Sequence, residues 1–213
     1  MQHLVLVRHG ESEINAIDRT TRTYCGQIET PLTDFGRKQA IDAAIRLAQF
    51  DFIQLRRAIS SPLTRAQETL QLMLGVLSGP IELLPASPAL MERSHGLFEG
   101  RRQDDVFQEY PHYRDDPNYS RFMSHFEQHA PGGENLTMVT ERAWAAVQEL
   151  TSQGSGDLIV VSHFNPIRCI LGQALALTSE QTLRLHIPNA EPIVLGWNGT
   201  FELVEAPDLY VSE

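Results

Sequence analysis

Two histidines, two arginines and one glutamate of this sequence could together transfer a phosphoryl group. A neutral imidazole can attack phosphorus and hold the phosphoryl group covalently until water removes it. Guanidinium groups can bind the phosphoryl oxygens through charge-assisted hydrogen bonds, and a second histidine can donate to another oxygen. A glutamate can protonate the leaving alcohol and then deprotonate the incoming water. The five candidates are Arg8, His9, Arg65, Glu92 and His163.

Each candidate follows a short stretch that is typical of a buried strand. The four stretches are residues 4–7, 52–60, 81–84 and 158–162. Arg8 and His9 directly follow the first, and His163 directly follows the fourth. Arg65 comes after the second, and Glu92 comes after the third across a loop. Because ligands gather at the carboxyl ends of the strands in open α/β sheets, we expect the five side chains to meet at one edge.

Amphipathic helical patterns alternate with the strand-like stretches. Thr33 is placed to cap the first helix, whose apolar stripe includes Ile41 and Ile45. Ser61 and Pro62 suit the cap and first turn of the second helix. The alternation predicts an α/β fold with a largely parallel sheet. Helices are predicted around residues 41–48, 66–77, 136–150 and 167–174, and a hairpin with an Asn-Gly turn around 193–203.

One domain is expected over residues 1–213, because no repeat, low-complexity tract or polar linker divides the chain. This length is ordinary for a single domain and can bury a core without disulfides or metals. Residues 100–131 interrupt the alternation and are predicted to form a small inserted lobe. They contain six aromatic residues and three histidines among charged side chains. A lobe that covers the site and a helical elaboration packed for stability both fit this composition.

The charge balance disfavours some classes of partner. The 213 residues include 17 basic and 27 acidic ones, and the net charge of −10 disfavours binding to nucleic acid or to anionic membranes. Lys38 is the only lysine, and the other 16 basic residues are arginines, which bind phosphate with a planar fork. Positive charge at an anion site would therefore have to be local.

The remaining composition favours a cytoplasmic protein. Cys25 and Cys169 form no Cys-x-x-Cys pair and are expected to be reduced thiols. The longest apolar runs are far shorter than the ~20 residues of a membrane span. The N-terminus has neither the basic region nor the apolar stretch of a signal peptide. A homodimer through an exposed sheet edge or the terminal hairpin is compatible with the sequence, which does not decide the oligomeric state.

The candidate residues stand in segments that resemble the histidine phosphatase superfamily, which includes the cofactor-dependent phosphoglycerate mutases. The resemblance extends over nearly the whole chain and implies a three-layer α/β/α fold with a largely parallel central sheet. The matching segments are LVRHGES at 6–12 with Asn15 behind it, Gly26 with TPLT at 30–33, SSPLTRAQET at 60–69, LME at 90–92, PGGE at 131–134 and VVSH at 160–163.

The resemblance implies a role for each candidate. His9 would be the phosphorylated nucleophile, and Glu92 the proton donor. Arg8, Arg65 and His163 would surround the phosphate. The family needs no metal, because arginines and a histidine supply the positive charge, and no cofactor is expected for this chain.

Two further positions are expected to contact the phosphate or the substrate. Asn15 matches a family position that helps to bind the phosphoryl group. Gly26, like Gly10, would let the backbone approach the anion closely. The sequence departs from the family at Gln27 and Glu29, where Trp and Asp are common, and at Phe164, where Gly is common. These changes alter the expected pocket wall and not the catalytic set.

Several competing interpretations are weaker. Glu99 lies near Glu92, but Glu92 holds the motif position of the acid. His125 and His129 are four residues apart and could bind a metal, although no clear third ligand accompanies them, so solvated histidines are expected. His95 and His186 have ordinary structural interpretations. Cys25 does not match a tyrosine-phosphatase nucleophile, because the sixth residue after it is Pro31 rather than an arginine, and the chain has no Gly-x-x-x-x-Gly-Lys-Ser/Thr loop.

The sequence therefore predicts an enzyme: a metal-independent phosphomonoesterase that acts on a small phosphorylated metabolite through phosphorylated His9. One alternative is an isomerase of the phosphoglycerate mutase type. The inserted lobe is shorter than in mutases of this family, and its obvious basic candidates for a substrate carboxylate are Arg101, Arg102, Arg114 and Arg121. Another alternative is an inactive module that binds a phosphorylated ligand, which would be expected to have lost the nucleophile or the acid.

Overall fold

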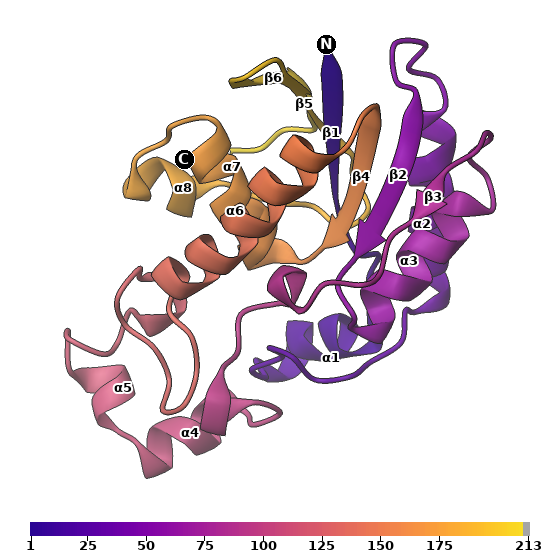
Figure 1. Cartoon of the computed structure of the whole chain (residues 1–213). Coiled ribbons are helices and arrows are strands. Elements are labelled where there is room, and N and C mark those ends of the chain that lie inside the picture. Colours follow the sequence, from indigo (N-terminus) through magenta and orange to yellow (C-terminus); the bar gives the residue numbers. More distant parts are fainter. Residues whose placement is uncertain (211–213) are drawn as a thin grey trace.

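The computed structural model describes residues 1–210, apart from the side chains of residues 18–21. A six-stranded sheet lies at its centre, in the order β3-β2-β4-β1-β5-β6. β1 to β4 pair with one another in parallel, and β5 and β6 add an antiparallel edge beside β1 (Figure 1). The strands are β1 Gln2–Arg8, β2 Leu55–Ser60, β3 Glu82–Leu83, β4 Asp157–Ser162, β5 Ile193–Trp197 and β6 Phe201–Glu205.

Helices cover both faces of this sheet, so the α/β/α prediction is confirmed (Figure 1). Alternate residues of β1 and β4 point to opposite faces. Val5 and Val7 pack in a core with α2 and α3, and Leu4 and Leu6 pack in a second core with α6 and α7. The helices are α1 Glu13–Thr21, α2 Asp34–Leu47, α3 Thr64–Leu74, α4 Gln103–Glu109, α5 His112–Asp115, α6 Leu136–Gln153, α7 Phe164–Ala174 and α8 Ser179–Arg184.

The strand register brings the expected site residues to one edge. Arg8, the last residue of β1, pairs with Ser162, the last residue of β4. Ser60, which ends β2, pairs with Val161. These three strands therefore end almost level with one another. Figure 1 shows that they point toward the part of the molecule that holds α1, α4 and α5.

Two local predictions on the helices were wrong. The buried face of α2 is small, formed by alanines and Leu47, and both Ile41 and Ile45 are exposed. The positions of the isoleucines did not identify the buried face of α2, because alanine side chains can also pack closely against the sheet. Ser61 does not cap the second helix, which begins at Thr64 after Leu63. By contrast, Thr33 caps α2 as predicted, because its side chain accepts a hydrogen bond from Gly36 N at 2.9 Å.

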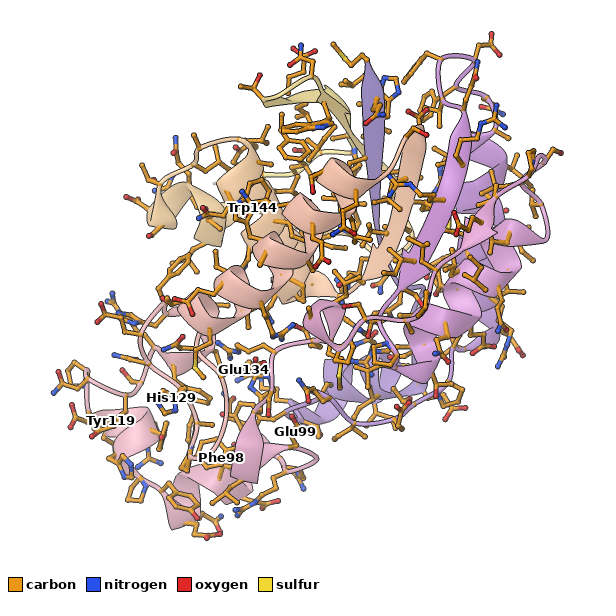
Figure 2. The ribbon with its side chains drawn as sticks, viewed as in Figure 1. Phe98, Glu99, Tyr119, His129, Glu134 and Trp144 are labelled. Carbon is orange, nitrogen blue, oxygen red and sulfur yellow. The ribbon has the colours of Figure 1, made fainter. Side chains whose placement is uncertain are left out.

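Residues 100–131 contain α4, α5 and a 3-10 turn, Phe122–Ser124. Their aromatic residues pack in a small separate core around Phe98 that includes Tyr24, Tyr113 and Phe122. Figure 2 shows Phe98 and Tyr119 in this part of the molecule, away from the sheet. Two other 3-10 turns, Pro88–Leu90 and Gly96–Phe98, lead into and follow the Glu92 segment. None of the helices over residues 1–210 is long and apolar enough to cross a membrane.

Candidate active site

The predicted residues surround one cavity at the carboxyl edge of the sheet. Its volume is about 190 Å³. The ring of His163 lies against that of His9, with 5.0 Å between the ring centroids. The expected residues that line the cavity itself are Arg8, His9, Asn15, Gly26, Arg65 and Glu92.

His9 is held so that one nitrogen of its ring faces the site. Its backbone N–H donates to Ser162 O at 3.0 Å, which joins the end of β1 to β4. Its Nδ1 lies 2.7 Å from Gly10 O, and since a carbonyl only accepts, Nδ1 carries the proton. Gly10 makes this turn possible, because a Cβ there would lie 2.3 Å from Gly36 O. In neutral His9, the lone pair is therefore on Nε2.

The charge state of His9 suits a nucleophile. Its side chain is 3% exposed, and burial lowers its pKa well below 6.5, with the nearby Arg65 and Arg8 guanidinium groups adding to the shift. Desolvation and positive neighbours both oppose protonation of an imidazole. The Nε2 lone pair is therefore available at neutral pH, where a protonated ring would have none.

Arg65 lies in the first turn of α3 and is 2% exposed. Its Nε donates to His9 Nε2 at 3.2 Å, while its two terminal nitrogens donate to the Ile28 and Gly26 carbonyls at 2.7 and 2.9 Å. Gly26 has a φ of +45°, and a Cβ there would lie 2.5 Å from a Glu99 oxygen. The positive φ favours glycine at this position, whose carbonyl helps to hold Arg65 against His9.

Arg8 provides a second guanidinium beside His9. One of its terminal nitrogens donates to Ile187 O at 2.8 Å, and its Nε is buried without a partner. Burial lowers the pKa of Arg8 to about 10, and Glu92 opposes that shift. Arg8 also lies over the Phe164 ring, 5.3 Å from its centroid. At the position where the family commonly has Gly, this chain has an aromatic ring that packs against the guanidinium of Arg8.

His163 is fully buried at the start of α7. Its Nε2 lies 2.8 Å from Ser61 Oγ, and its Nδ1 has no hydrogen-bond partner. Burial lowers the pKa of His163 well below 6.5, and Arg65 is the next cause. Ser61 therefore orients this ring instead of capping a helix. An unpaired buried nitrogen is costly, and a hydrogen bond from Nδ1 to a ligand would remove that cost.

Glu92 is fixed at the cavity wall by backbone groups. Its Oε1 accepts from the Arg93 N–H at 2.7 Å, and its Oε2 lies 3.5 Å from Asn165 N. Glu99, the competing carboxylate, instead accepts from His95 N at 3.0 Å and does not line the cavity. Of these two, Glu92 is placed to exchange a proton with a ligand.

Asn15 lies at the start of α1, an element that the sequence patterns did not predict. Its Oδ1 accepts from both the N–H and the hydroxyl of Ser12, at 3.3 and 2.9 Å. The amide NH₂ group is left to donate into the cavity. Asn15 therefore offers a further donor beside Arg8 and His9.

Other cavity residues could not be found from the sequence. Tyr24 and Met123 belong to no recognisable motif. Met123 lies in residues 100–131, which interrupt the alternating strand and helix patterns. His95 was expected to be an ordinary structural residue, but it lines the cavity, and burial lowers its pKa to about 3. The unforeseen lining residues are Ile14, Thr23, Tyr24, Cys25, His95, Met123 and Asn165.

His125 and His129 lie apart from this cavity. His125 Nδ1 accepts the N–H groups of Glu127 and Gln128 at 3.1 and 3.2 Å, and His129 Nδ1 lies 2.9 Å from Ala130 O. Within residues 1–210, no group of three or more His, Cys, Asp or Glu side chains is placed to hold a metal ion.

The α/β/α fold and this site of two histidines and two arginines at the sheet edge define a class of α/β protein, and comparison with known proteins identifies the family. The family model of the histidine phosphatase superfamily (branch 1) matches residues 4–206. The chain belongs to this superfamily. A 2,3-bisphosphoglycerate-dependent phosphoglycerate mutase of Parvibaculum lavamentivorans is 31% identical over 195 residues, which span 90% of this chain and 88% of the relative.

Solved structures share the fold along the whole chain. Bacillus stearothermophilus YhfR superposes with a TM-score of 0.79 at 25% identity, covering 100% of this chain and 98% of that one. The alpha-ribazole phosphatase of Shigella flexneri gives a TM-score of 0.76 at 24% identity, covering 99% and 100%. The sequence is thus similar to mutases, and the structure is similar to phosphatases.

Proposed function

We propose that this protein is a metal-independent phosphomonoesterase that transfers the phosphoryl group of a small substrate to His9 and then to water. The observation that carries the proposal is the state of His9: a buried neutral ring, with Nδ1–H fixed on Gly10 O and Nε2 turned to two guanidinium groups. Only such a ring combines an available lone pair with neighbours that bind the oxygens of the phosphoryl group.

In the first step, His9 Nε2 attacks phosphorus, the N–P bond forms and the P–O bond to the leaving alcohol breaks. Arg65 exchanges its bond to Nε2 for a phosphoryl oxygen, and Arg8 Nε and Asn15 NH₂ bind further oxygens. His163 Nδ1, if protonated when the anion binds, donates to another. Protonated Glu92 gives its proton to the leaving oxygen, so that a neutral alcohol departs.

In the second step, the same groups act in reverse. Glu92, now a carboxylate, takes a proton from water while the water oxygen attacks phosphorus. The N–P bond breaks, inorganic phosphate forms, and His9 returns to the neutral tautomer that its bond to Gly10 O favours. Arg8 and Arg65 hold the phosphoryl group in both steps, so positioning and electrostatic stabilisation supply most of the catalysis.

The distribution of cations favours hydrolysis over isomerisation. A phosphoglycerate presents a carboxylate near its phosphate, but among the side chains that the structure describes, Arg8 and Arg65 are the only Lys or Arg that line the cavity. The basic residues of the 100–131 segment do not reach it, and Arg101 and Arg114 pair with Glu109 and Asp115. A mutase remains the second candidate because the curated relatives carry that name. The cytoplasmic location and the homodimer stay predictions.

The test is phosphate release from sugar phosphates, phosphoglycerates, nucleotides and an aryl phosphate, measured in EDTA. Each phosphoglycerate reaction is also analysed for isomerised product. We expect release that EDTA does not affect, with isomerisation slower than release. Isomerisation faster than release would make the protein a mutase. The absence of both activities would favour the inactive binding module.

A further inference from the structure

His95 is a buried titratable side chain in the catalytic cavity that the proposed mechanism does not use. It is 5% exposed, it lines the cavity, and its ring lies 5.6 Å from that of Tyr24, measured between centroids. His95 comes three residues after Glu92, which gives its proton to the leaving oxygen in the proposed mechanism. A side chain from the same segment is therefore placed to contact the leaving group.

Backbone contacts fix the segment that carries His95. The His95 N–H donates to Glu99 Oε1 at 3.0 Å, and the Leu97 N–H donates to Pro131 O at 3.0 Å. Gly96 has a φ of +52°, and a Cβ there would overlap the Pro131 carbonyl oxygen. The segment is thereby held against the loop before α6, so the His95 ring starts from a fixed backbone position.

Arg93 decides which nitrogen of the His95 ring carries the proton. Arg93 is fully buried, and its Nη1 donates to Phe122 O at 2.9 Å. Its Nη2 lies 3.4 Å from His95 Nδ1. A guanidinium group has donors only, so Nδ1 must accept, and the neutral ring carries its proton on Nε2. Burial lowers the pKa of His95 to about 3, and the Arg93 charge adds to the shift, so the ring stays neutral at physiological pH.

The Nε2–H group of His95 is left for a ligand. Within the part of the chain that the structure describes, the hydrogen bonds of His95 use its backbone N–H and its Nδ1. Arg8, Arg65 and Asn15 already offer donors to the phosphoryl oxygens on the other side of the cavity. The His95 donor is therefore available to a different part of the substrate.

We propose that His95 is a specificity residue, which donates from Nε2–H to a hydroxyl or ether oxygen of the leaving group. The inference rests on the proposed function, because the leaving group meets His95 only when the phosphoryl group lies against His9. Arg93 is a positioning residue, whose backbone N–H holds Glu92 Oε1 at 2.7 Å and whose side chain fixes the His95 tautomer. A leaving group with a methyl group at this place would bury the donor without an acceptor, which costs binding free energy.

Non-hydrolysable phosphonates test the contact independently of turnover. ω-Hydroxyalkylphosphonates with two to five carbons are each compared with the alkylphosphonate in which a methyl group replaces the hydroxyl, by their Kd in calorimetry. At one chain length, we expect the hydroxyl compound to bind about 3- to 10-fold more tightly, as for one net hydrogen bond. The absence of a hydroxyl preference at every length would overturn the inference.

Variants assign the preference to His95. His95→Phe keeps a ring and removes the donor, so the preference should disappear. His95→Gln can place an amide N–H near the position of Nε2 and should retain a preference. His186→Phe alters an exposed histidine outside the cavity and should keep the preference in full. A preference that survives in His95→Phe, or that is lost equally in His186→Phe, would overturn the assignment.

The tautomer is measured in the unaltered protein, so this test does not depend on the folding of a variant. Long-range ¹H–¹⁵N NMR spectra of the histidine rings are recorded from pH 7.5 down to about pH 5, and the His95 signals are assigned by their loss in His95→Gln. We expect a proton on Nε2 and none on Nδ1 throughout. A proton on Nδ1, in a neutral or a doubly protonated ring, would overturn the role of Arg93 and His95.

Hydrolysis of an aryl phosphate is scored separately. A protein without this activity that still shows the His95-dependent hydroxyl preference would refute the proposed function alone. An active protein without the preference would refute the role of His95 alone.

Discussion

The two ends of β4 place buried polar groups in opposite situations. At its start, Asp157 accepts the N–H groups of His3 and Gln54 at 2.7 and 2.6 Å, and its Oδ1 lies 3.2 Å from His3 Nδ1. Just after its end, His163 uses only one ring nitrogen, on Ser61. Both side chains are almost completely buried. Asp157 is satisfied within the protein and holds the fold, whereas His163 keeps bonding capacity for a ligand.

The same difference separates the catalytic edge from the rest of the molecule. Arg142 and Glu134, which lies just before α6 (Figure 2), pair at 2.7 Å, and Arg142 also binds the Ala89 and Met91 carbonyls. Arg8 has no such carboxylate partner and keeps a buried, unpaired Nε. Desolvated guanidinium groups without a paired anion are costly unless a ligand supplies the charge. We therefore expect substitutions at the catalytic edge to lower the catalytic rate. Substitutions of buried polar groups that are fully hydrogen-bonded within the protein should lower stability instead.

The largest expected effect is that of His9→Ala. Removal of the nucleophile should lower kcat for an aryl phosphate by at least about 10⁴-fold, comparable to the loss of a nucleophile in other covalent enzymes. Steady-state phosphate release measures it. His186→Ala, which removes an exposed histidine outside the cavity, is the matched control and should retain activity. A folded His9→Ala protein that keeps its activity would contradict the expectation that residues at the catalytic edge determine the rate.

Glu92→Gln should have the next largest effect, and the effect should depend on the leaving group. Loss of general acid catalysis should slow alkyl phosphate hydrolysis by about 10²–10⁴-fold. Aryl phosphates should lose less, because a phenolate needs less protonation. The measurement is kcat for a series of leaving groups of increasing pKa. Glu99→Gln is the matched control, and a steeper leaving-group dependence there than in Glu92→Gln would exchange the two roles.

At the other end of β4, Asp157→Ala should change stability and leave catalysis intact. The substitution leaves the buried N–H groups of His3 and Gln54 without their acceptor, so unfolding should become easier by about 3 kcal/mol. Urea unfolding measures this loss, and kcat for the folded variant should match that of the unaltered protein. A large fall in kcat with little loss of stability would contradict the distinction between the two ends.

The last predicted effect is a pH dependence of stability. Burial holds the pKa of His9 and His163 well below 6.5 and that of His95 at about 3. Below pH 6.5 the unfolded chain therefore binds protons that the native protein does not, and the free energy of unfolding falls as pH is lowered. The expected slope is about 1.4 kcal/mol per pH unit for each histidine, down to its native pKa.

Urea unfolding between pH 7.5 and about pH 5, where His residues titrate before the carboxylates, measures this slope. His95→Gln should reduce the slope by the share of one histidine, and His186→Gln, which removes an exposed histidine, should leave it unchanged. A slope that is the same in both variants would show that His95 is not held neutral in the native protein.

Much of the site could be predicted because its residues follow strands. Arg8, His9 and His163 directly follow β1 and β4, and a parallel register brings strand ends together without any knowledge of side-chain packing. Arg65 and Glu92 depended more on the order of the matched segments, since a helix turn and a loop place them. The sequence therefore predicted best the positions of those residues that directly follow a strand of the sheet.

The sequence was less informative where position depends on packing between distant segments. The helical spacing of four apolar residues predicts α2, but of Ile41, Ala44, Ile45 and Ala48 only Ala44 is buried. Two other alanines, Ala40 and Ala43, are also buried in this helix. Tyr24 packs in the aromatic core around Phe98, and Met123 directly follows Phe122 of that core. No local pattern predicts that both residues line the cavity. His95 lies directly before the 3-10 turn Gly96–Phe98 and lines the cavity, and a single histidine in a loop has no periodic signal.

Direct detection of phosphorylated His9 tests the central claim. The protein is mixed with a ³²P-labelled aryl phosphate and quenched within its first turnovers, and the peptide that carries the label is identified by mass spectrometry. The account predicts label on the His9 peptide that is lost in acid and stable in alkali, and none in His9→Asn. Rapid phosphate release by the unaltered protein without such label, or label on another residue, would contradict it.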